Sequence, residues 1–284
     1  MRDPATVLPE AGATPTKKLK TVLGRAAALA GVYSRRFRSV MTIVAFHRVN
    51  DTHARDGLTC SPEKFRAFCR FFQQHFRVVS LSEQVAGCRA GRNMGGTLSI
   101  TFDDGYLDNF TVAAPILREF GLPATFFVTT SFIASETVPA WDAHLAVPHG
   151  WMTWDHLRAL RAQGFEIGCH TDTHINMGSA APGTIRAELE ISKQKVLAEL
   201  GVAAELFAYP FGGREHITDL SRKLVREASF SCCASCHGGV NPPIADPYAL
   251  KRIGIAEWFD TPDQFGFEVI TNRTETSAGA VTNA

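Results

Sequence analysis

The stretch Thr97-Leu-Ser-Ile-Thr-Phe-Asp-Asp-Gly-Tyr106 joins a strand pattern to a pair of charges. Polar and apolar residues alternate up to Phe102, as in a β-strand, and two adjacent carboxylates follow, Asp103 and Asp104. The carboxyl ends of strands are where α/β proteins keep their functional sites. Adjacent side chains leave a strand in different directions, so one carboxylate can bind a cation while the other faces a water molecule or a substrate. A plain Asp-Asp-Gly turn fits the same residues.

The pattern around this stretch predicts an α/β domain with a largely parallel sheet. From Met41 onward, short β-rich runs alternate with longer runs of helical period. Ser61 and Pro62 predict the start of a helix, whose phenylalanines recur at spacings of three and four along one buried face. The expected strands cover residues 41–46, 77–80, 97–102, 124–129, 165–168, 205–209 and 250–255. Positive φ angles are expected at helix ends, at glycines 91, 121, 164 and 201.

Length and composition indicate a folded domain with an extension at each end. The chain has 284 residues, 45% of them hydrophobic and 20% charged, which excludes a mainly disordered, collagenous or coiled-coil protein. We expect the domain over residues 41–270, a partly disordered extension with a basic helix over residues 1–40, and a flexible tail over residues 271–284. The net charge of +1 gives no electrostatic reason to expect nucleic acid as a partner. The oligomeric state stays open.

Cysteine usage and the first forty residues bear on location. Seven irregularly spaced cysteines favour a reducing compartment, and no apolar run approaches the roughly 20 residues of a transmembrane helix. The segment from Lys17 to Ala30 only loosely resembles an export signal, because Arg25 interrupts its apolar part. The same segment fits a helix on an anionic membrane surface, and a solvated helix face fits it too. We therefore expect a cytoplasmic protein or one peripheral at the cytoplasmic membrane face, with export as the alternative.

The run Cys233-Ala-Ser-Cys236-His237 spells a c-type haem attachment pattern. We discount haem because its attachment needs export and a distal ligand. We discount a zinc tetrad because no second cysteine pair is present to complete it.

Two histidines follow another expected strand. The run that ends at Cys169 leads directly into His170-Thr-Asp-Thr-His174. Two imidazoles four residues apart can reach one point from the same side of a helical turn, as in many metal sites. With a carboxylate from another strand end they form a two-histidine, one-carboxylate face that leaves positions open for water and substrate. Open positions indicate catalysis rather than a structural metal.

A third segment, Leu206 to Gly213, leaves a further strand in a rigid turn with proline and glycines. Together the three segments resemble the polysaccharide deacetylase family, the NodB-homology carbohydrate esterases. The run Thr101-Phe-Asp-Asp-Gly-Tyr106 matches the first motif of the family residue for residue, and His170-Thr-x-x-His174 matches the second. The resemblance covers roughly residues 42–259, and the runs 152–157 and 209–212 are similar to the bacterial exopolysaccharide and capsule branch.

The resemblance implies a fold, a metal and a set of roles. The fold would be a distorted (β/α)7 barrel of the NodB-homology type. Asp104, His170 and His174 would bind a divalent metal, most often zinc, with cobalt, nickel or manganese as substitutes. Asp103 would be the general base that takes a proton from water, whose pKa a bound cation lowers toward about 7. The oxyanion would be stabilised by the metal and by the backbone N–H of Phe211.

This sequence departs from the family in two positions. Many relatives draw the general acid from a late Leu-x-His motif, which is missing here, so we predict His47, directly after the first strand, as the acid. A histidine that only ends a strand is the alternative. Relatives orient the base with an arginine where this chain has Ala208, and we predict that Arg252 supplies that charge. A surface salt bridge of Arg252 fits as well.

Aromatic residues of the motifs suit a sugar pocket, since aromatic faces pack on the C–H faces of pyranose rings. We predict this role for Tyr106, Phe211 and Trp154, with core packing as an equal alternative for Trp154.

The sequence thus predicts a metal-dependent hydrolase that removes N-acetyl groups from an N-acetylated sugar in a polysaccharide or glycan precursor and releases acetate. Two other functions stay open. One is an amidase or deformylase acting on a lipid-linked or small non-polymeric substrate. The other is a catalytically impaired glycan-binding relative, which Ala208 suggests.

Overall fold

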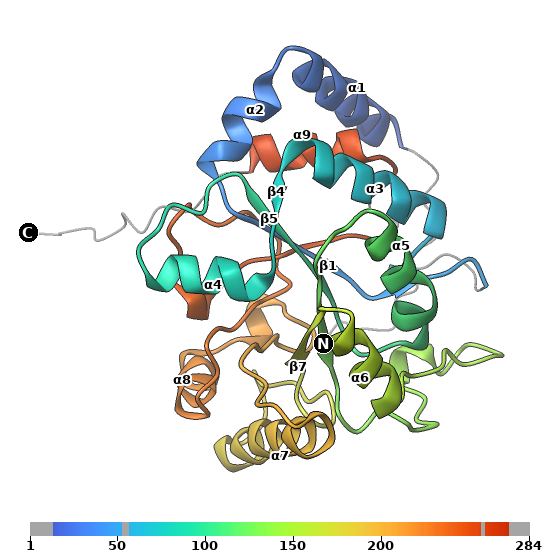
Figure 1. Cartoon of the computed structure of the whole chain (residues 1–284), viewed down its shortest axis with the longest axis vertical. Coiled ribbons are helices and arrows are strands. Elements are labelled where there is room, and N and C mark those ends of the chain that lie inside the picture. Colours follow the sequence, from blue (N-terminus) through green and yellow to red (C-terminus); the bar gives the residue numbers. More distant parts are fainter. Residues whose placement is uncertain (1–13, 53–56, 257–258, 273–284) are drawn as a thin grey trace, which may run out of the picture.

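The structure, a computed structural model, describes residues 14–52, 57–256 and 259–272. Residues 1–13 of the extension predicted over residues 1–40, and residues 273–284 of the tail predicted over residues 271–284, lie outside these residues. The α-helices are α1 (Pro15–Leu29), α2 (Val32–Arg36), α3 (Pro62–His75), α4 (Leu81–Arg89), α5 (Ala114–Glu119), α6 (Trp154–Ala162), α7 (Pro182–Leu200), α8 (Asp219–Glu227) and α9 (Pro262–Thr271). Figure 1 shows these helices arranged around the strands, with α1, α2, α3 and α9 gathered at one end.

The central sheet is parallel. Its strands are β1 (Thr42–Phe46), β4 (Arg77–Val78), β5 (Thr97–Phe102), β6 (Thr125–Val128), β7 (Glu166–Cys169) and β8 (Ile253–Gly254), in the order β7-β6-β5-β1-β8 with β4 beside the start of β5. A separate parallel pair joins β2 (Arg48–Val49) to β3 (Thr59–Cys60). Every residue of β1 and β5 is buried, as expected for strands covered by helices on the outside.

Isolated parallel bridges continue the sheet from β7 back to β8. They pair Cys169 with Phe207, Ala208 with Ala234, and Ala234 with Leu250, which lies three residues before β8. Since β8 pairs with β1, the backbone pairings run round a ring, as in a distorted barrel. The α/β barrel fold predicted from the family resemblance is therefore confirmed.

The sequence predictions of local structure hold in most places. Ser61 caps α3 by accepting a hydrogen bond from the Lys64 amide, and the four predicted glycines all have positive φ. The expected strand over residues 205–209 is the exception, because it forms single bridges rather than a ladder. Pro210, which has no amide hydrogen to donate, follows at once and turns the chain away.

The aromatic face of α3 packs on the sheet. Phe65 lies 5.0 Å from Phe46 and 5.7 Å from Phe102, ring centre to ring centre and edge to face in both pairs. Phe46 and Phe102 stack at 5.4 Å, and all three rings are fully buried. This packing fixes β1 and β5 next to each other and so positions the residues that follow them.

The N-terminal helix packs on the last helix of the domain. Lys17 pairs with Asp260 at 3.1 Å, and Lys20 pairs with Glu268. Gly24 permits the close approach, since a Cβ atom there would lie 1.9 Å from the carbonyl oxygen of Asp263. None of the described helices combines the length and the apolar character needed to cross a bilayer.

Gly168→Ala is expected to destabilise the fold by about 1–3 kcal/mol, because over-packing forces buried neighbours to move. A Cβ atom on Gly168 would lie 2.5 Å from the buried ring of Phe127 and 3.0 Å from the Leu206 carbonyl oxygen. Gly183→Ala in α7 is the matched control, since nothing lies within 4 Å of its added Cβ. Urea unfolding of both variants would measure the difference. Equal midpoints would show that the structure around β7 accommodates the added methyl group without loss of stability.

Candidate active site

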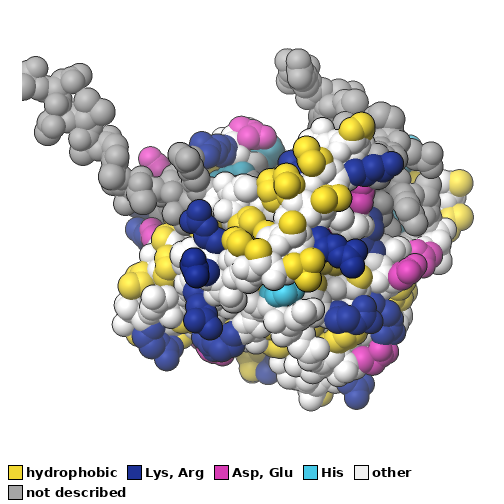
Figure 2. Space-filling model, turned by 90° about the horizontal axis from the view of Figure 1, so that it is seen from above, with side chains coloured by type: hydrophobic (Ala, Val, Ile, Leu, Met, Phe, Trp, Pro, Cys, Tyr) yellow, Lys and Arg dark blue, Asp and Glu magenta, His cyan; other side chains and the backbone are white. Residues whose placement is uncertain are grey.

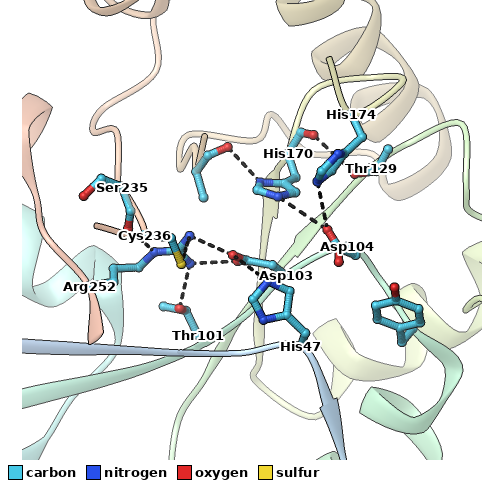
Figure 3. A network of polar contacts seen from close by, with 12 residues as sticks. His47, Thr101, Asp103, Asp104, Thr129, His170, His174, Ser235, Cys236 and Arg252 are labelled. Atoms are coloured by element: carbon cyan, nitrogen blue, oxygen red, sulfur yellow. Dashed lines mark hydrogen bonds and ion pairs between the residues drawn. The ribbon is translucent and has the colours of Figure 1, made fainter. Parts of the chain in front are cut away.

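The predicted functional side chains lie where strands of the sheet end. His47 follows β1, Asp103 and Asp104 follow β5, and His170 follows β7. Because β1, β5, β6 and β7 are parallel neighbours, their carboxyl ends meet on one side of the sheet. Figure 3 shows these side chains, with His174, pointing toward a common centre.

Asp104, His170 and His174 form a compact group of metal-ligand type. Their ligand atoms all lie within 4.8 Å of one another, with His170 Nε2 3.5 Å and His174 Nε2 3.3 Å from Asp104 Oδ1. Ligand atoms about 2.1 Å from a tetrahedral zinc ion lie roughly 3.4 Å apart. Burial alone would raise the pKa of Asp104, but the adjacent His174 holds it below the usual value, so the carboxylate is ionised. The group therefore fits one divalent cation.

The second ring nitrogen of His170 sets its protonation. Nδ1 lies 2.9 Å from the backbone oxygen of Ala208, so it carries the proton and donates to that carbonyl. Burial lowers the pKa of His170 to about 4, which keeps the ring neutral at physiological pH. Nε2 then presents a lone pair to Asp104 Oδ1, a buried oxygen with no hydrogen-bond donor among the described residues. Two facing acceptors repel each other, and a cation between them would remove that repulsion.

Asp103 is held by a buried arginine. Arg252 Nη1 and Nη2 donate to the two carboxylate oxygens of Asp103 at 2.7 Å each, in a bidentate pair. Arg252 is itself fixed, since Nε donates to the Ser235 carbonyl at 2.8 Å and Nη1 to Thr101 Oγ1 at 2.9 Å. Burial favours the neutral form of Asp103, but Arg252 outweighs it and holds the pKa below its usual value. Asp103 is thus an ionised carboxylate in one fixed orientation.

His47 lies beside Asp103 and reaches solvent. Its Nε2 is 4.0 Å from Asp103 Oδ2, and its side chain is 21% exposed. The backbone of His47 is also held, because Asn109 Nδ2 donates to its carbonyl oxygen at 2.7 Å. Asn109 begins a π-helical turn over Asn109–Ala113, a geometry that is frequent at functional sites. A solvent-accessible imidazole therefore stands within reach of the carboxylate predicted as base.

The turn after Tyr209 brings Phe211 to the site. The Phe211 ring lies 4.7 Å from the His174 ring, and the Phe211 amide has no hydrogen-bond acceptor among the described residues. Gly212 packs so closely on the next segment that a Cβ atom would lie 2.3 Å from the Cys236 nitrogen. The Cys236 amide donates to the Gly212 carbonyl at 2.9 Å, which fixes the turn. The amide of Phe211 is thus a held donor without an acceptor.

Backbone strain gathers at this site. Non-glycine residues with positive φ include Asp104 at 73°, Thr171 at 64°, His174 at 60° and Phe211 at 60°. Such conformations cost about 1–3 kcal/mol each and persist where the surrounding structure enforces them. Two of the three metal-ligand candidates are therefore held in orientations that an unconstrained chain would avoid.

An aromatic residue that the sequence did not single out covers the metal-ligand group. Trp141 lies 4.6 Å from the His174 ring and 6.3 Å from the Phe211 ring, and it is partly exposed. Its Nε1 donates to the Tyr106 hydroxyl at 2.9 Å, and that hydroxyl donates to Asp142 Oδ2 at 3.1 Å. Trp141, rather than Tyr106, presents an aromatic surface at the site.

The prediction that Tyr106 walls a sugar pocket needs correction. Tyr106 is 1% exposed, because Trp151 stacks on its ring and Trp141 donates to its hydroxyl, so its ring is not open to a ligand. Trp154 starts α6 and packs against the main hydrophobic core, the alternative considered for it. Phe211, 46% exposed, remains open to a ligand.

The cysteine run has structural contacts. Cys232 and Cys233 are buried, and Cys233 Sγ donates to the Tyr248 carbonyl at 2.9 Å. Cys236 lies beside Arg252, with Sγ 3.8 Å from Nη2, and burial raises the pKa of its thiol to about 11. The seven cysteines are free thiols in the structure.

The fold and this geometry define a class of protein: an α/β barrel with a two-histidine, one-carboxylate group at its strand ends and a second, arginine-held carboxylate beside it. The chain belongs to the polysaccharide deacetylase family, whose model matches residues 90–232, half of its length. That match contains both the Asp-Asp motif and the His-x-x-x-His motif.

Individual relatives agree with the family. The chain is 33% identical over 124 residues to a gellan lyase of Bacillus sp., covering 43% of this chain and 4% of that protein. It is 24% identical over 157 residues to YxkH of Bacillus subtilis (strain 168), whose name proposes a polysaccharide deacetylase, covering 55% of this chain and 50% of that one. The chain thus spans half the length, or far less, of these curated relatives. A solved de-N-acetylase from Aggregatibacter actinomycetemcomitans superposes with a TM-score of 0.68 at 18% identity, covering 80% of this chain and 99% of that one, and shares the fold.

Proposed function

We propose that this protein is a metal-dependent hydrolase that removes N-acetyl groups from an N-acetylated sugar in a polysaccharide or glycan precursor and releases acetate. Membership of the polysaccharide deacetylase family supports the removal of acetyl groups. One observation carries the hydrolytic chemistry: an ionised carboxylate, Asp103, is held bidentately by Arg252 next to three side chains that fit one cation.

Each residue then has a task in amide hydrolysis. A divalent metal held by Asp104, His170 and His174, for which zinc fits best, would polarise the acetamide carbonyl and lower the pKa of water toward about 7. Asp103 takes the proton of the attacking water, and Arg252 keeps both carboxylate oxygens in place. The Phe211 amide donates to the oxyanion, a contact typically worth about 3 kcal/mol. His47 protonates the nitrogen, since an amine cannot leave as an anion.

Arg252 also bears on the alternative of an impaired glycan-binding relative. That alternative rests on Ala208, which stands where relatives have the arginine that orients the base. Arg252 approaches Asp103 from the segment before β8 and makes the bidentate contact from there. The backbone oxygen of Ala208 meanwhile accepts the hydrogen bond of His170. Asp103 is therefore paired with Arg252 even though position 208 carries no arginine. This pairing supports an active enzyme rather than an impaired relative.

Acetate release tests the proposal directly. The protein is stripped with a chelator, reloaded with zinc, and given a panel of N-acetylated oligosaccharides. We expect acetate only from the zinc-loaded protein, and neither activity nor zinc binding in His174→Ala. His144→Ala, an exposed histidine, is the matched control and should behave as wild type. Sugar binding without acetate release would favour the impaired relative, and activity only on small or lipid-linked amides would favour the amidase.

His47→Ala is expected to lower the hydrolysis of acetamido sugars by about 10²-fold or more, because general acid catalysis is lost. An aryl acetate with a nitrophenol leaving group needs no proton on that group, so its hydrolysis should fall far less. The ratio of the two rates separates an acid from a structural histidine. An equal loss on both substrates would contradict the assignment of His47 as the acid.

A further inference from the structure

The helix α1 has two faces of opposite character. Its inner face, against α9, is small and polar: Thr21 Oγ1 lies 3.0 Å from Thr261 Oγ1, Lys17 pairs with Asp260, and Gly24 contacts the Asp263 backbone. Amphipathic helices of folded domains usually bury their apolar side. Here the polar side makes the contacts with the domain, which leaves the apolar side outward.

The outer face is a stripe of exposed apolar side chains. Leu19 is 59% exposed, Val22 64%, Leu23 42% and Leu29 84%. Positions three and four apart share one helix face, and Ala26, also exposed, lies between them on that face. Figure 2 shows hydrophobic side chains in a row across this end of the molecule, with Lys and Arg side chains around the row. We call these residues, 19, 22, 23, 26 and 29, the α1 stripe.

The surroundings of the α1 stripe are basic. Lys18 and Arg25 are exposed on the helix beside the stripe, and Arg35, Arg36 and Arg38 are exposed in the segment that follows. The sequence from Thr14 to Asn50 contains no aspartate or glutamate. Lys17 pairs with Asp260 and Lys20 pairs with Glu268, so Lys18 and the arginines are the cations that remain outward. An occupant of this surface is therefore apolar at its centre and anionic around it.

The size of the α1 stripe favours a membrane over a protein as its occupant. The α1 stripe runs from residue 19 to residue 29, about 16 Å along the helix, and the exposed face is about 10 Å wide, so the stripe covers roughly 160 Å². A stable protein interface needs about 800 Å² per partner. An amphipathic helix in a bilayer interface has no such requirement, because its apolar side chains enter the acyl boundary one by one while basic side chains meet anionic headgroups.

We propose that the α1 stripe docks this protein reversibly on a membrane surface of anionic phospholipid, with Lys18 and Arg25 at the headgroups. The helix lies in the plane of the interface and α9 lies on its far side, toward the domain. The inference is independent of the proposed hydrolysis, since it rests on no residue of the candidate active site.

Sedimentation with lipid vesicles tests the proposal on the full chain. We expect the protein to bind vesicles of phosphatidylcholine with phosphatidylglycerol and to bind pure phosphatidylcholine at least about tenfold more weakly. Leu19→Ser/Val22→Ser/Leu29→Ser should lower the partition coefficient by more than about tenfold, because the apolar contribution is lost. Lys18→Gln/Arg25→Gln should weaken binding at low salt, and salt should weaken the wild type similarly, as screening shortens the reach of charge.

Matched controls keep the test decisive. Leu220→Ser/Ile244→Ser removes exposed apolar side chains away from α1 and should bind as wild type. Circular dichroism checks the fold, and acetate release from a soluble substrate should not change in any of these variants. Equal binding by the α1 variant and wild type, or no binding by wild type, would overturn the proposal. A concentration-dependent dimer that the α1 variant abolishes would overturn it too, in favour of a second copy.

Discussion

Asp103→Asn is expected to slow acetate release by about 10²–10⁴-fold, because an amide cannot accept the proton of the attacking water. Zinc binding should survive, since Asp104, His170 and His174 are unchanged. The expected result is thus a protein that holds its metal and its substrate but hardly turns over. Acetate release under saturating substrate and zinc titration of the same preparation would measure the two properties.

The control must separate lost chemistry from lost folding. Arg252 is fully buried, and removal of one partner of a buried ion pair typically costs about 3–5 kcal/mol. Urea unfolding at the assay temperature should therefore show that Asp103→Asn is fully folded before its activity is compared. Asp155→Asn is the matched control, since Asp155 is 87% exposed and pairs with Arg158 at the surface. A folded Asp103→Asn with wild-type activity would place the base elsewhere.

The residues that follow predicted strands were the ones that sequence could locate. Strand patterns place Asp103 and Asp104 at the carboxyl end of β5 and His170 at that of β7, and the parallel order β7-β6-β5 brings both ends to the same side of the sheet. The rings of His170 and His174 meet as expected, but across a bend with positive φ at Thr171 and His174, and not on the helical turn that their spacing suggested. The roles of these residues stay predictions, because they depend on chemistry that the geometry permits but only activity can test.

Contacts between loops could not be predicted from the sequence. Trp141 and Asp142 lie in a short 3₁₀ turn within a long irregular segment, where no periodicity indicates which side chain faces inward. Arg48 Nη1 donates to Asp142 Oδ1 at 2.7 Å across 94 residues, and its guanidinium lies over the Tyr106 ring. Tyr106 was predicted as a wall of a sugar pocket because aromatic faces pack on the C–H faces of pyranose rings. The Trp141 loop covers it, and only the number of apolar residues in that loop could have indicated this.

The orientation of α1 on the domain also could not be predicted from composition. Composition showed a basic, partly apolar helix but not which face meets the domain. Gly24 was the available signal, because a helix interior favours other residues unless a close backbone approach requires glycine. Its contact with the Asp263 carbonyl decides the packed face and so turns Leu19 and Leu29 outward.

Arg252→Met is expected to have the largest effect on stability, about 3–5 kcal/mol, because Asp103 would stay buried with its charge unpaired. Arg252→Lys keeps the charge but not the planar fork that grips both carboxylate oxygens. We expect it to recover part of the stability and part of the activity. Arg226→Met is the matched control, since its pair with Asp246 at 3.4 Å is more than half exposed and worth at most about 1 kcal/mol.

A second arm separates the structural from the positioning role of Arg252. The double variant Asp103→Leu/Arg252→Met removes both charges, so urea unfolding should show a protein more stable than Arg252→Met alone. Its acetate release should stay absent, since the base is gone. In Arg252→Lys, the turnover number should fall more than the Michaelis constant rises, because a loosely held base affects the chemical step and not the binding of substrate. A folded Arg252→Met with wild-type turnover would contradict the positioning role of Arg252. Asp103 would then be oriented without Arg252, and another group would have to replace the arginine that relatives have at the position of Ala208.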